Sequence, residues 1–371
     1  MSRVLALGRF VFAWGTVLVF FVFGAGWLAD LSSPVKSAAL FLWLLGVIVW
    51  CAFGVVEQAD HLAEILEEPL GTLILTLSIV IIEVALIAAV MLGARAVPTL
   101  GRDTMFAVLM IVLNGVVGLA LLLGGMRHHE QDYNLQGAVA YVAVIVPLSV
   151  VPLVLPNFTR STPDSTLTGP QAFFFALFTL LLYGVFLAVQ TVRHRHFFVE
   201  PARGDGGVVI APGESDHTVS PRAVTGHAFL LVVLVLPIVL LAKQLAKLID
   251  HGIAVLGAPV ALGGVLIAVI VFAPEGISAL RAALANQLQR AVNLCLGGAL
   301  STIGLTVPAV LLTAWLTGRP VVLGIDPASM VLLAVTLALC MLTFSGSPTT
   351  VLEGAVHLVV FLVYVVLIFS P

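Results

Sequence analysis

The sequence predicts an all-α polytopic membrane protein with about eleven transmembrane helices, arranged as two inverted five-helix repeats after one extra N-terminal helix. Of its 371 residues, 61% are hydrophobic and 9% are charged, whereas soluble domains carry about 25% charged residues. The apolar residues form runs of about 20, the length that a helix needs to cross a bilayer. One long polar segment, 193–222, separates six of these runs from the remaining five.

The apolar runs predict the membrane spans in chain order. We expect the eighth span to continue as helix to about residue 285, and the fifth is rich in proline. The expected spans are 9–29, 37–56, 70–92, 104–125, 137–156, 172–192, 227–249, 255–274, 291–316, 327–345 and 350–369. The corresponding domains are an extra transmembrane helix over 1–30, a first repeat over 37–192, a polar linker loop over 193–226 and a second repeat over 227–371.

The repeat is predicted from the number of spans and from a few matched residues. An odd number of spans per half inverts the second half relative to the first, as in inverted-repeat transporters. Aligning Glu83 with Glu275 also aligns Gly71 with Gly263. Further along each half, Asn114-x-x-x-Gly118 matches Asn293-x-x-x-Gly297. The segment between the halves is rich in Gly, Pro and Ser, and is therefore read as a linker.

Glu83 and Glu275 are the strongest candidates for a functional site. Each is the only ionisable residue within its apolar run, and a carboxylate in a bilayer is costly unless it faces an interior cavity. A carboxylate is a hard oxygen ligand for metal cations and can also take up a proton. One Ca²⁺, two monovalent cations or two protons can each neutralise the pair. The alternative is that both are structural residues satisfied by local hydrogen bonds.

Nearby polar side chains are candidates for further cation or proton ligands. Amide and hydroxyl oxygens within the spans suit this role, although hydrogen bonding between helices beside small residues is an alternative for the amides and hydroxyls of the Asn114 and Asn293 helices. These candidates are Asn114, Asn293, Ser301, Thr302, Thr76 and Ser78. Pro274, directly before Glu275, indicates either a broken helix that offers carbonyl groups to a cation or a simple kink or helix start.

The segment EQADHLAEILEEPLG, residues 57–71, is acidic and precedes the third span. We interpret it as an interfacial helix at a cavity mouth, where its charge attracts cations; a metal site that includes His61 and Glu64 is the alternative. The candidate cavity-mouth residues are Asp60, Glu64, Glu67 and Glu68.

Several classes of function are excluded by what the sequence lacks. It has no Walker loop, no G-x-S-x-G, no HExxH and no cysteine–histidine metal spacing, so we expect neither an enzyme nor a cofactor. The net charge is −3 without a basic block, which argues against nucleic acid as a partner. Nine lysines and arginines on one side against seven on the other give a weak positive-inside bias with the N-terminus in the cytoplasm.

Four stretches carry a resemblance to a known family. They are EPLGTLILTLSIVIIEVALI, LLYGVFLAVQTVRHRHF, PEGISALRAALANQLQRAVNLCLGGALSTIGLTVPAV and VLEGAVHLVVFLVY. In these stretches the chain resembles the calcium/proton exchanger family of the calcium/cation antiporter superfamily. It is especially similar to the bacterial ChaA-type sodium/potassium/calcium–proton antiporters.

The resemblance implies eleven spans in two inverted five-span repeats, with Glu83 and Glu275 in one central site. It also implies a secondary active antiporter of the bacterial cytoplasmic membrane that extrudes Ca²⁺, Na⁺ or K⁺ in exchange for H⁺, within the lipid bilayer and without nucleotide. The chain departs from the commoner exchangers at the G-N-A-x-E motif, where it has IVIIE and VFAPE. Antiport is therefore a firmer expectation than calcium selectivity. The alternatives are a channel, a sodium/calcium exchanger without proton coupling, and a non-transporting membrane scaffold.

Overall fold

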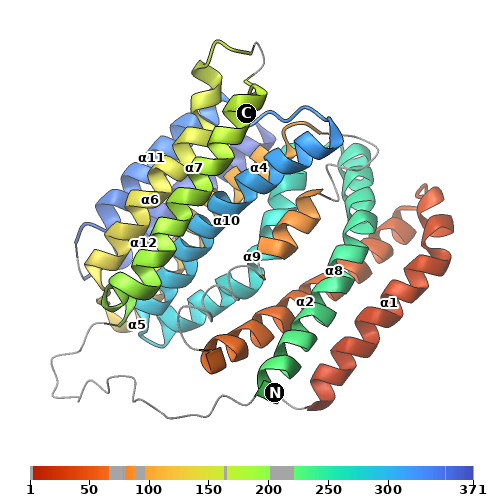
Figure 1. Cartoon of the computed structure of the whole chain (residues 1–371), viewed down its shortest axis with the longest axis horizontal. Helices are drawn as coiled ribbons and strands as arrows, with labels where there is room; N and C mark the ends of the chain where they lie inside the picture. The colour runs from red at the N-terminus through yellow and green to blue at the C-terminus, as the bar shows by residue number, and fades with distance from the viewer. Residues whose placement is uncertain are drawn as a thin grey trace.

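The computed structural model describes the chain over residues 3–66, 78, 80–88, 97–162, 165–200, 221–346 and 348–370. Within these residues the secondary structure is helical apart from one isolated β-bridge, between Gln131 and Thr349. Consecutive long helices run in opposite directions, so that α1 begins at one end of the bundle and α12 finishes at the other (Figure 1). We call these ends the amino-terminal face and the carboxy-terminal face.

The helices before the linker begin with α1 (Arg3–Ala29) and α2 (Pro34–Leu66). Of the predicted third span, the structure describes residues 78 and 80–88, which are helical. The fourth span is one continuous helix made of α4, the π-helix η1 and α5. The remaining elements of this half are α4 (Leu100–Leu109), the π-helix η1 (Met110–Val116), α5 (Val117–His128), α6 (Leu135–Leu153), η2 (Leu155–Phe158), α7 (Gly169–Ala188), η3 (Val189–Arg193) and η4 (Arg195–Phe198).

The helices after the linker are longer and less interrupted. They are α8 (Pro221–Leu256), α9 (Ala261–Leu284), α10 (Leu288–Thr317), α11 (Pro327–Thr343) and α12 (Val351–Phe369). The expected extension of the eighth span to about residue 285 is confirmed, since α9 ends at Leu284. Its expected start at 255 is wrong, because α8 continues to Leu256. The chain breaks just after that, where Gly257 adopts a φ of +62° and Pro259 follows.

Side-chain caps fix several helix starts. Asn134 accepts hydrogen bonds from the backbone of Gln136 and Gly137 at the start of α6. Thr168 with Gln171, and Thr350 with Glu353, form capping boxes at the starts of α7 and α12. These caps satisfy backbone N–H groups that have no partner within the helix. The expected boundaries therefore shift by only a few residues at these helices.

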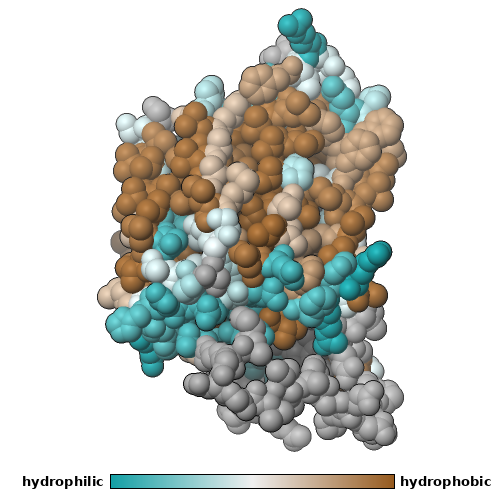
Figure 2. All heavy atoms as spheres, turned by 90° about the vertical axis from the view of Figure 1, so that its left-hand side faces the viewer, coloured by the Kyte–Doolittle hydropathy of each residue, from teal (hydrophilic) through white to brown (hydrophobic). Residues whose placement is uncertain are grey.

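The apolar surface of the bundle confirms that the chain is a membrane protein. Nine helical segments within the described residues are long and apolar enough to cross a membrane, and α11 is a shorter apolar helix. One side of the bundle shows an apolar band with hydrophilic side chains at both ends (Figure 2). Large exposed residues such as Phe21 and Trp315 belong to the apolar surface. In water this surface would be unfavourable, whereas in lipid it is the expected covering.

The packing of the helices follows a two-part plan. α2 packs against α8, the corresponding first helix of the second half. α5 packs against α12, and α10 packs against α7. In each pair the third span of one half contacts the fifth span of the other half. This is the packing expected of two related five-helix halves. α1 lies outside this plan and packs against α8 and α2.

Candidate cation and proton site

Glu83 is completely buried and is held by α10. Its Oε2 accepts a hydrogen bond of 2.9 Å from Thr302 Oγ1, and the residue is 0% exposed. Among the described residues, Glu83 Oε1 has no hydrogen-bond partner. Thr306, one turn further along α10, lies beside the same carboxylate, although its Oγ1 makes no hydrogen bond of normal geometry within the described chain. Glu83 therefore keeps one oxygen available within a hydroxyl-lined environment.

Glu275 meets the same helix one turn away. It lies on α9, and its Oε2 is close to Gly298 of α10, where an added Cβ would come within 3.1 Å of that oxygen. The same Cβ would meet the ring of Phe272 at 2.6 Å. A side chain at position 298 would therefore displace the carboxylate or the ring. The absence of a side chain at Gly298 lets α9 and α10 approach closely enough to bury Glu275.

The two carboxylates therefore share one face of α10. Gly298 and Thr302 are four residues apart, which places them on one side of a helix, about 6 Å apart along its axis. Glu275 contacts the first position and Glu83 the second. Two acidic groups from different halves of the chain are thus brought to adjacent turns of one helix.

The helix that carries Glu275 is continuous through Pro274. α9 runs without a break from Ala261 to Leu284, so of the two predicted alternatives the broken helix is wrong. Proline nevertheless has no N–H to bond the carbonyl one turn earlier, which is that of Ile270. The Ser278 hydroxyl donates to the Pro274 carbonyl at 3.0 Å. The proline therefore opens one backbone acceptor next to Glu275 without ending the helix.

A pocket of about 440 Å³ lies near the amino-terminal face, beside the part of α9 that carries Glu275. It is lined by Pro274 and Ser278, on either side of Glu275 in the sequence, and by residues of α1 and α2 that include Glu57. Glu275 keeps 7% of its surface exposed, whereas Glu83 keeps none. Arg9 and Arg281 also line this pocket, and Glu57 pairs with Arg9 at 3.3 Å. Glu275 is therefore the carboxylate nearer to solvent.

The structure places the other predicted ligands at different distances from the carboxylates. Thr302 lies in the site. Ser301 is buried, and its hydroxyl donates to the Gly298 carbonyl at 3.0 Å. Ser78 is buried on the helix that carries Glu83. Asn293 lies toward the amino-terminal face, where its Nδ2 donates to the Phe198 carbonyl at 2.7 Å. A ligand role for Asn293 would require the amide to leave this bond.

Asn114 belongs to a separate buried network. It lies in the π-helix η1, and its Nδ2 donates to Thr336 Oγ1 at 2.8 Å. Its Oδ1 lies 3.2 Å from His357 Nδ1. An amide oxygen only accepts, so Nδ1 carries the proton, and His357 Nε2 accepts from Thr343 Oγ1 at 3.0 Å. This network ties η1 to α11 and α12, and Asn114 makes these bonds rather than any with the carboxylates.

Some predicted site residues cannot be placed. Thr76, Glu67 and Glu68, and the side chains of Asp60 and Glu64, lie outside the described residues. The backbone of the acidic segment is described up to residue 66, where it forms the last turns of α2. The expected acidic helix is thus continuous with the second span as far as it can be followed. Whether those side chains attract cations stays a prediction.

Sequence reasoning missed two contributors to this site and one to the separate Asn114 network. Thr306 follows Thr302 at helical spacing, a signal that was available in the sequence. Gly298 is one of 33 glycines, and nothing in the sequence marks it as the residue against which Glu275 packs. His357 is fully buried, and its partners at 114 and 343 are distant in sequence from one another.

The arrangement suits the binding of a positive charge in a buried place. Two carboxylates in a low-dielectric interior repel each other unless cations or protons compensate them. The oxygens available are two carboxylates and the hydroxyls of Thr302 and Thr306. These are hard ligands suited to Na⁺, K⁺ or Ca²⁺. The site can therefore alternate between metal-bound and protonated forms without becoming an uncompensated pair of charges.

The chain is similar to curated proteins over nearly its whole length. It is 39% identical over 346 residues to the sodium-potassium/proton antiporter ChaA of Escherichia coli, covering 93% of this chain and 92% of that protein. It is 40% identical over 339 residues to the putative ionic transporter y4hA of Sinorhizobium fredii, covering 91% and 90% respectively.

Solved structures share the fold. The structure of native YfkE matches with a TM-score of 0.71 at 16% identity, covering 98% of this chain and 100% of that one. The H⁺/Ca²⁺ exchanger CAX matches with a TM-score of 0.64 at 14% identity, covering 96% and 89%. The family model described as sodium/calcium exchanger protein matches residues 36–192 and 226–370. With this match over most of the chain, and with a relative 39% identical over 93% of it, the protein belongs to the sodium/calcium exchanger protein family.

Proposed function

We propose that this protein is a secondary active antiporter that exchanges Ca²⁺, Na⁺ or K⁺ for protons. The observation that carries the proposal is the convergence of Glu83 and Glu275 on adjacent turns of α10. The name of the ChaA relative, a sodium-potassium/proton antiporter, supports Na⁺ and K⁺ as the cations and supports the coupling to protons. The solved Ca²⁺/H⁺ exchangers add support for the fold on which such exchange takes place.

The burial of the pair accounts for exchange rather than leakage. When the site holds a cation, or when both carboxylates are protonated, little net charge crosses the membrane interior. An empty, doubly ionised site would carry two uncompensated charges, and such a form is costly in a low-dielectric medium. The site therefore changes its side of access only when it is loaded. Loading by a cation in one direction and by protons in the other is antiport.

The two glutamates have different roles in this cycle. Glu275 lies next to the pocket that opens at the amino-terminal face, so it meets an entering cation first. Glu83 is held in place by Thr302 and presents its free oxygen from deeper in the bundle. Binding of the cation is complete when both carboxylates contact it. Protons arriving from the carboxy-terminal face then neutralise the carboxylates and release it.

We further propose that the amino-terminal face is cytoplasmic in the inner membrane of a bacterium. The weak excess of basic residues on this face supports this orientation, and the two bacterial relatives support a bacterial membrane. The pocket near Glu275 then opens to the cytoplasm, and the direction of transport is extrusion. The family match over 36–192 and 226–370 supports two repeats joined by a linker over 193–226.

The first prediction tests the carboxylates. In inverted membrane vesicles with an imposed pH gradient, addition of CaCl₂, NaCl or KCl to the native protein should collapse the gradient for at least one cation. Glu83→Gln and Glu275→Gln should each abolish the collapse, because glutamine can neither bind a proton nor compensate a cation. Glu130→Gln, at an exposed position, should behave like the native protein. A pH-sensitive dye reports the result.

Each variant must also be present and folded, which membrane content and thermal stability in detergent measure. Full exchange activity in either glutamine variant would contradict the role of that residue. Movement of ²²Na⁺ or ⁴⁵Ca²⁺ by the native protein without any change in pH would instead indicate exchange without proton coupling. Lowered stability of the glutamine variants, with no transport by the native protein, would favour a scaffold in which the glutamates only hold helices together.

A further inference from the structure

The π-helix η1 lies next to the exchange site, by which we mean Glu83 and Glu275 with the face of α10 that they share. It packs against both α9 and α10. Val116 of η1 lies over Gly276, the residue that follows Glu275. An added Cβ at Gly276 would be 3.4 Å from Val116 Cγ2, which is an ordinary van der Waals distance. This irregular turn therefore adjoins the segment of α9 that carries Glu275.

The other side of η1 is held by Asn114, the one polar residue of this π-helix. Its Nδ2 donates to Thr336 Oγ1 of α11 at 2.8 Å, and its Oδ1 accepts from His357 Nδ1 of α12 at 3.2 Å. All three residues are completely buried, so a lost hydrogen bond there would leave a polar group unsatisfied. A π-helical turn is rare and often marks a functional site. The bonds of Asn114 are therefore the polar side-chain restraints on its conformation.

His357 forms hydrogen bonds through both ring nitrogens. Its Nδ1 carries the proton that Asn114 accepts, and its Nε2 accepts from Thr343 Oγ1 at 3.0 Å. Thr336 and Thr343 are seven residues apart and so share one face of α11. The position requires a donor close to the α12 backbone and an acceptor further out, both at the same time. A neutral imidazole provides the two together, whereas the amide of asparagine or glutamine can serve only one of the two places.

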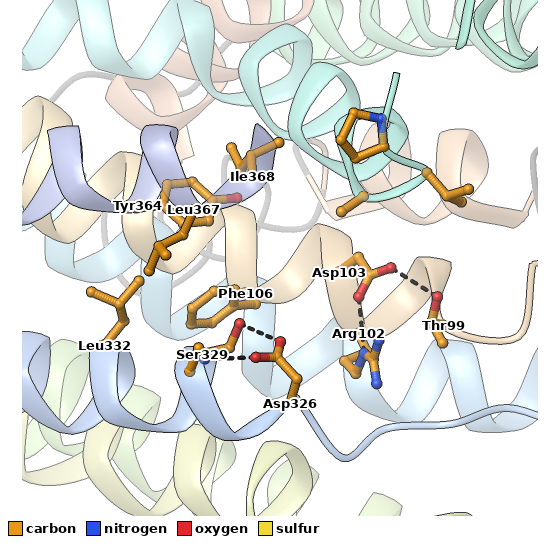
Figure 3. A pocket seen from close by; sticks show the side chains of 14 residues that line it. Thr99, Arg102, Asp103, Phe106, Asp326, Ser329, Leu332, Tyr364, Leu367 and Ile368 are labelled. Atoms are coloured by element: carbon orange, nitrogen blue, oxygen red, sulfur yellow. Dashed lines mark hydrogen bonds and ion pairs between the residues drawn. The ribbon is translucent and has the colours of Figure 1, made fainter. Parts of the chain in front are cut away.

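α12 is fixed along the continuous helix that contains η1, so it supports His357 firmly. Near the end of α12, Tyr364 packs edge-on against Phe106 of α4 with the ring centroids 5.6 Å apart, where both line a pocket at the carboxy-terminal face (Figure 3). Three residues earlier, the ring of Phe361 covers Gly115 of η1, where an added Cβ would lie 3.4 Å from the ring. These contacts hold His357 at the level of η1.

We propose that His357 is a positioning residue for Glu275. Its Nδ1–H holds the Asn114 amide, the amide keeps η1 as a π-helix, and the π-helix keeps Val116 against Gly276. If η1 relaxed to a regular α-helix, the turn would lose one residue, and the residues after it would rotate by about 100°. Val116 would then leave Gly276, and α9 would lose this support beside Glu275. The effect on cation binding rests on the proposed function, whereas the effect on the packing of Val116 does not.

The second prediction tests this packing without transport. In a full-length chain whose three native cysteines are replaced by alanine, Val116→Cys with Gly276→Cys should form a disulfide under mild oxidation, because an added Cβ at 276 already contacts the Val116 side chain. His357→Asn should keep this disulfide, since its amide nitrogen takes the place of Nδ1 and still bonds Asn114. His357→Gln should lower the yield roughly fivefold, the effect of about one hydrogen bond, since its longer side chain reaches Thr343 instead. Mass spectrometry of the linked peptides measures the yield in membranes.

Transport is the second readout, in the chain with its native cysteines. His357→Gln should raise the half-saturating cation concentration roughly fivefold and change the maximal rate less, because a bound cation draws both carboxylates back into place. His357→Asn should stay close to the native value. Thr343→Val is the matched control, since it removes only the bond to Nε2. It should resemble His357→Asn in both experiments.

Equal disulfide yields in His357→Asn and His357→Gln would overturn the proposal, and so would equal half-saturating concentrations in these two variants. Loss of the disulfide in His357→Asn or in Thr343→Val would do the same. A lower Tm of His357→Gln with a native disulfide yield would show that the residue only stabilises the bundle, which contradicts a positioning role. A native protein that exchanges nothing contradicts the proposed function, and the disulfide yields still decide whether His357 holds η1.

Discussion

Glu83 and Glu275 differ in what restrains them. Glu83 is restrained by a hydroxyl donor, Thr302, whereas Glu275 is fitted against the bare backbone of Gly298. A donor to a carboxylate favours its ionised form, so Thr302 helps Glu83 to hold a cation in competition with protons. The rarity of a charge in an apolar run made both glutamates predictable from the sequence. Their neighbours were less predictable, because they belong to another helix and only packing selects them.

The third prediction concerns Thr302. Thr302→Val keeps a similar shape but removes the donor to Glu83, and a hydrogen bond to a charged group contributes about 1.5–3 kcal/mol. We expect the half-saturating cation concentration at neutral pH to rise roughly tenfold, and the difference from the native protein to shrink as the pH rises and fewer protons compete. Cation-dependent proton flux in vesicles across a pH series measures both effects.

Thr313→Val is the matched control for this change. Thr313 lies on the same helix, but its hydroxyl donates to the Ala309 carbonyl within α10. Thr313→Val should therefore leave the half-saturating cation concentration unchanged. An equal effect of the two variants, or no effect of Thr302→Val at any pH, would contradict the assigned role of Thr302.

The contact between α5 and α12 depends on small residues. An added Cβ at Gly354 of α12 would meet the Leu122 backbone nitrogen and would lie 2.8 Å from the Gly118 carbonyl oxygen. Helices in membranes approach this closely where they lack side chains, because packing replaces the hydrophobic driving force. The same helix pair continues into the network in which His357 bonds Asn114 of the π-helix. The close contact therefore supports the irregular backbone at the centre of the bundle.

The fourth prediction follows from this contact. Gly354→Val should lower stability by roughly 1–3 kcal/mol, the usual cost of inserting a side chain into a packed interface, because backbone atoms of α5 cannot move aside. Gly184→Val is the control, since an added Cβ on this α7 glycine meets nothing within 4 Å. Thermal unfolding in detergent, followed by intrinsic fluorescence, should show a lower Tm for Gly354→Val only. Equal values of Tm for the two variants would show that the contact does not limit stability.

At the scale of the whole molecule, the sequence predicted the bundle better than it predicted the contacts inside it. The length of an apolar run and its lack of charged residues follow directly from the thickness and apolarity of the bilayer. Most expected spans therefore match the observed helices within a few residues. Local irregularities have weaker signals. The π-helix over Met110–Val116 has no residue signature, and the pocket at the carboxy-terminal face joins positions 103, 326 and 364. Only the three-dimensional arrangement of the helices brings those positions together.

The fifth prediction tests the orientation of the molecule. Ser161 lies in an exposed connection at the carboxy-terminal face, and Ser345 lies in an exposed connection at the amino-terminal face. The native cysteines Cys51, Cys295 and Cys340 are buried and should not react. With a cytoplasmic amino-terminal face, a membrane-impermeant maleimide should label Ser161→Cys in intact cells and Ser345→Cys only in inverted vesicles. The reverse labelling pattern would show that the amino-terminal face lies outside the cell. The pocket beside Glu275 would then receive its cation from outside.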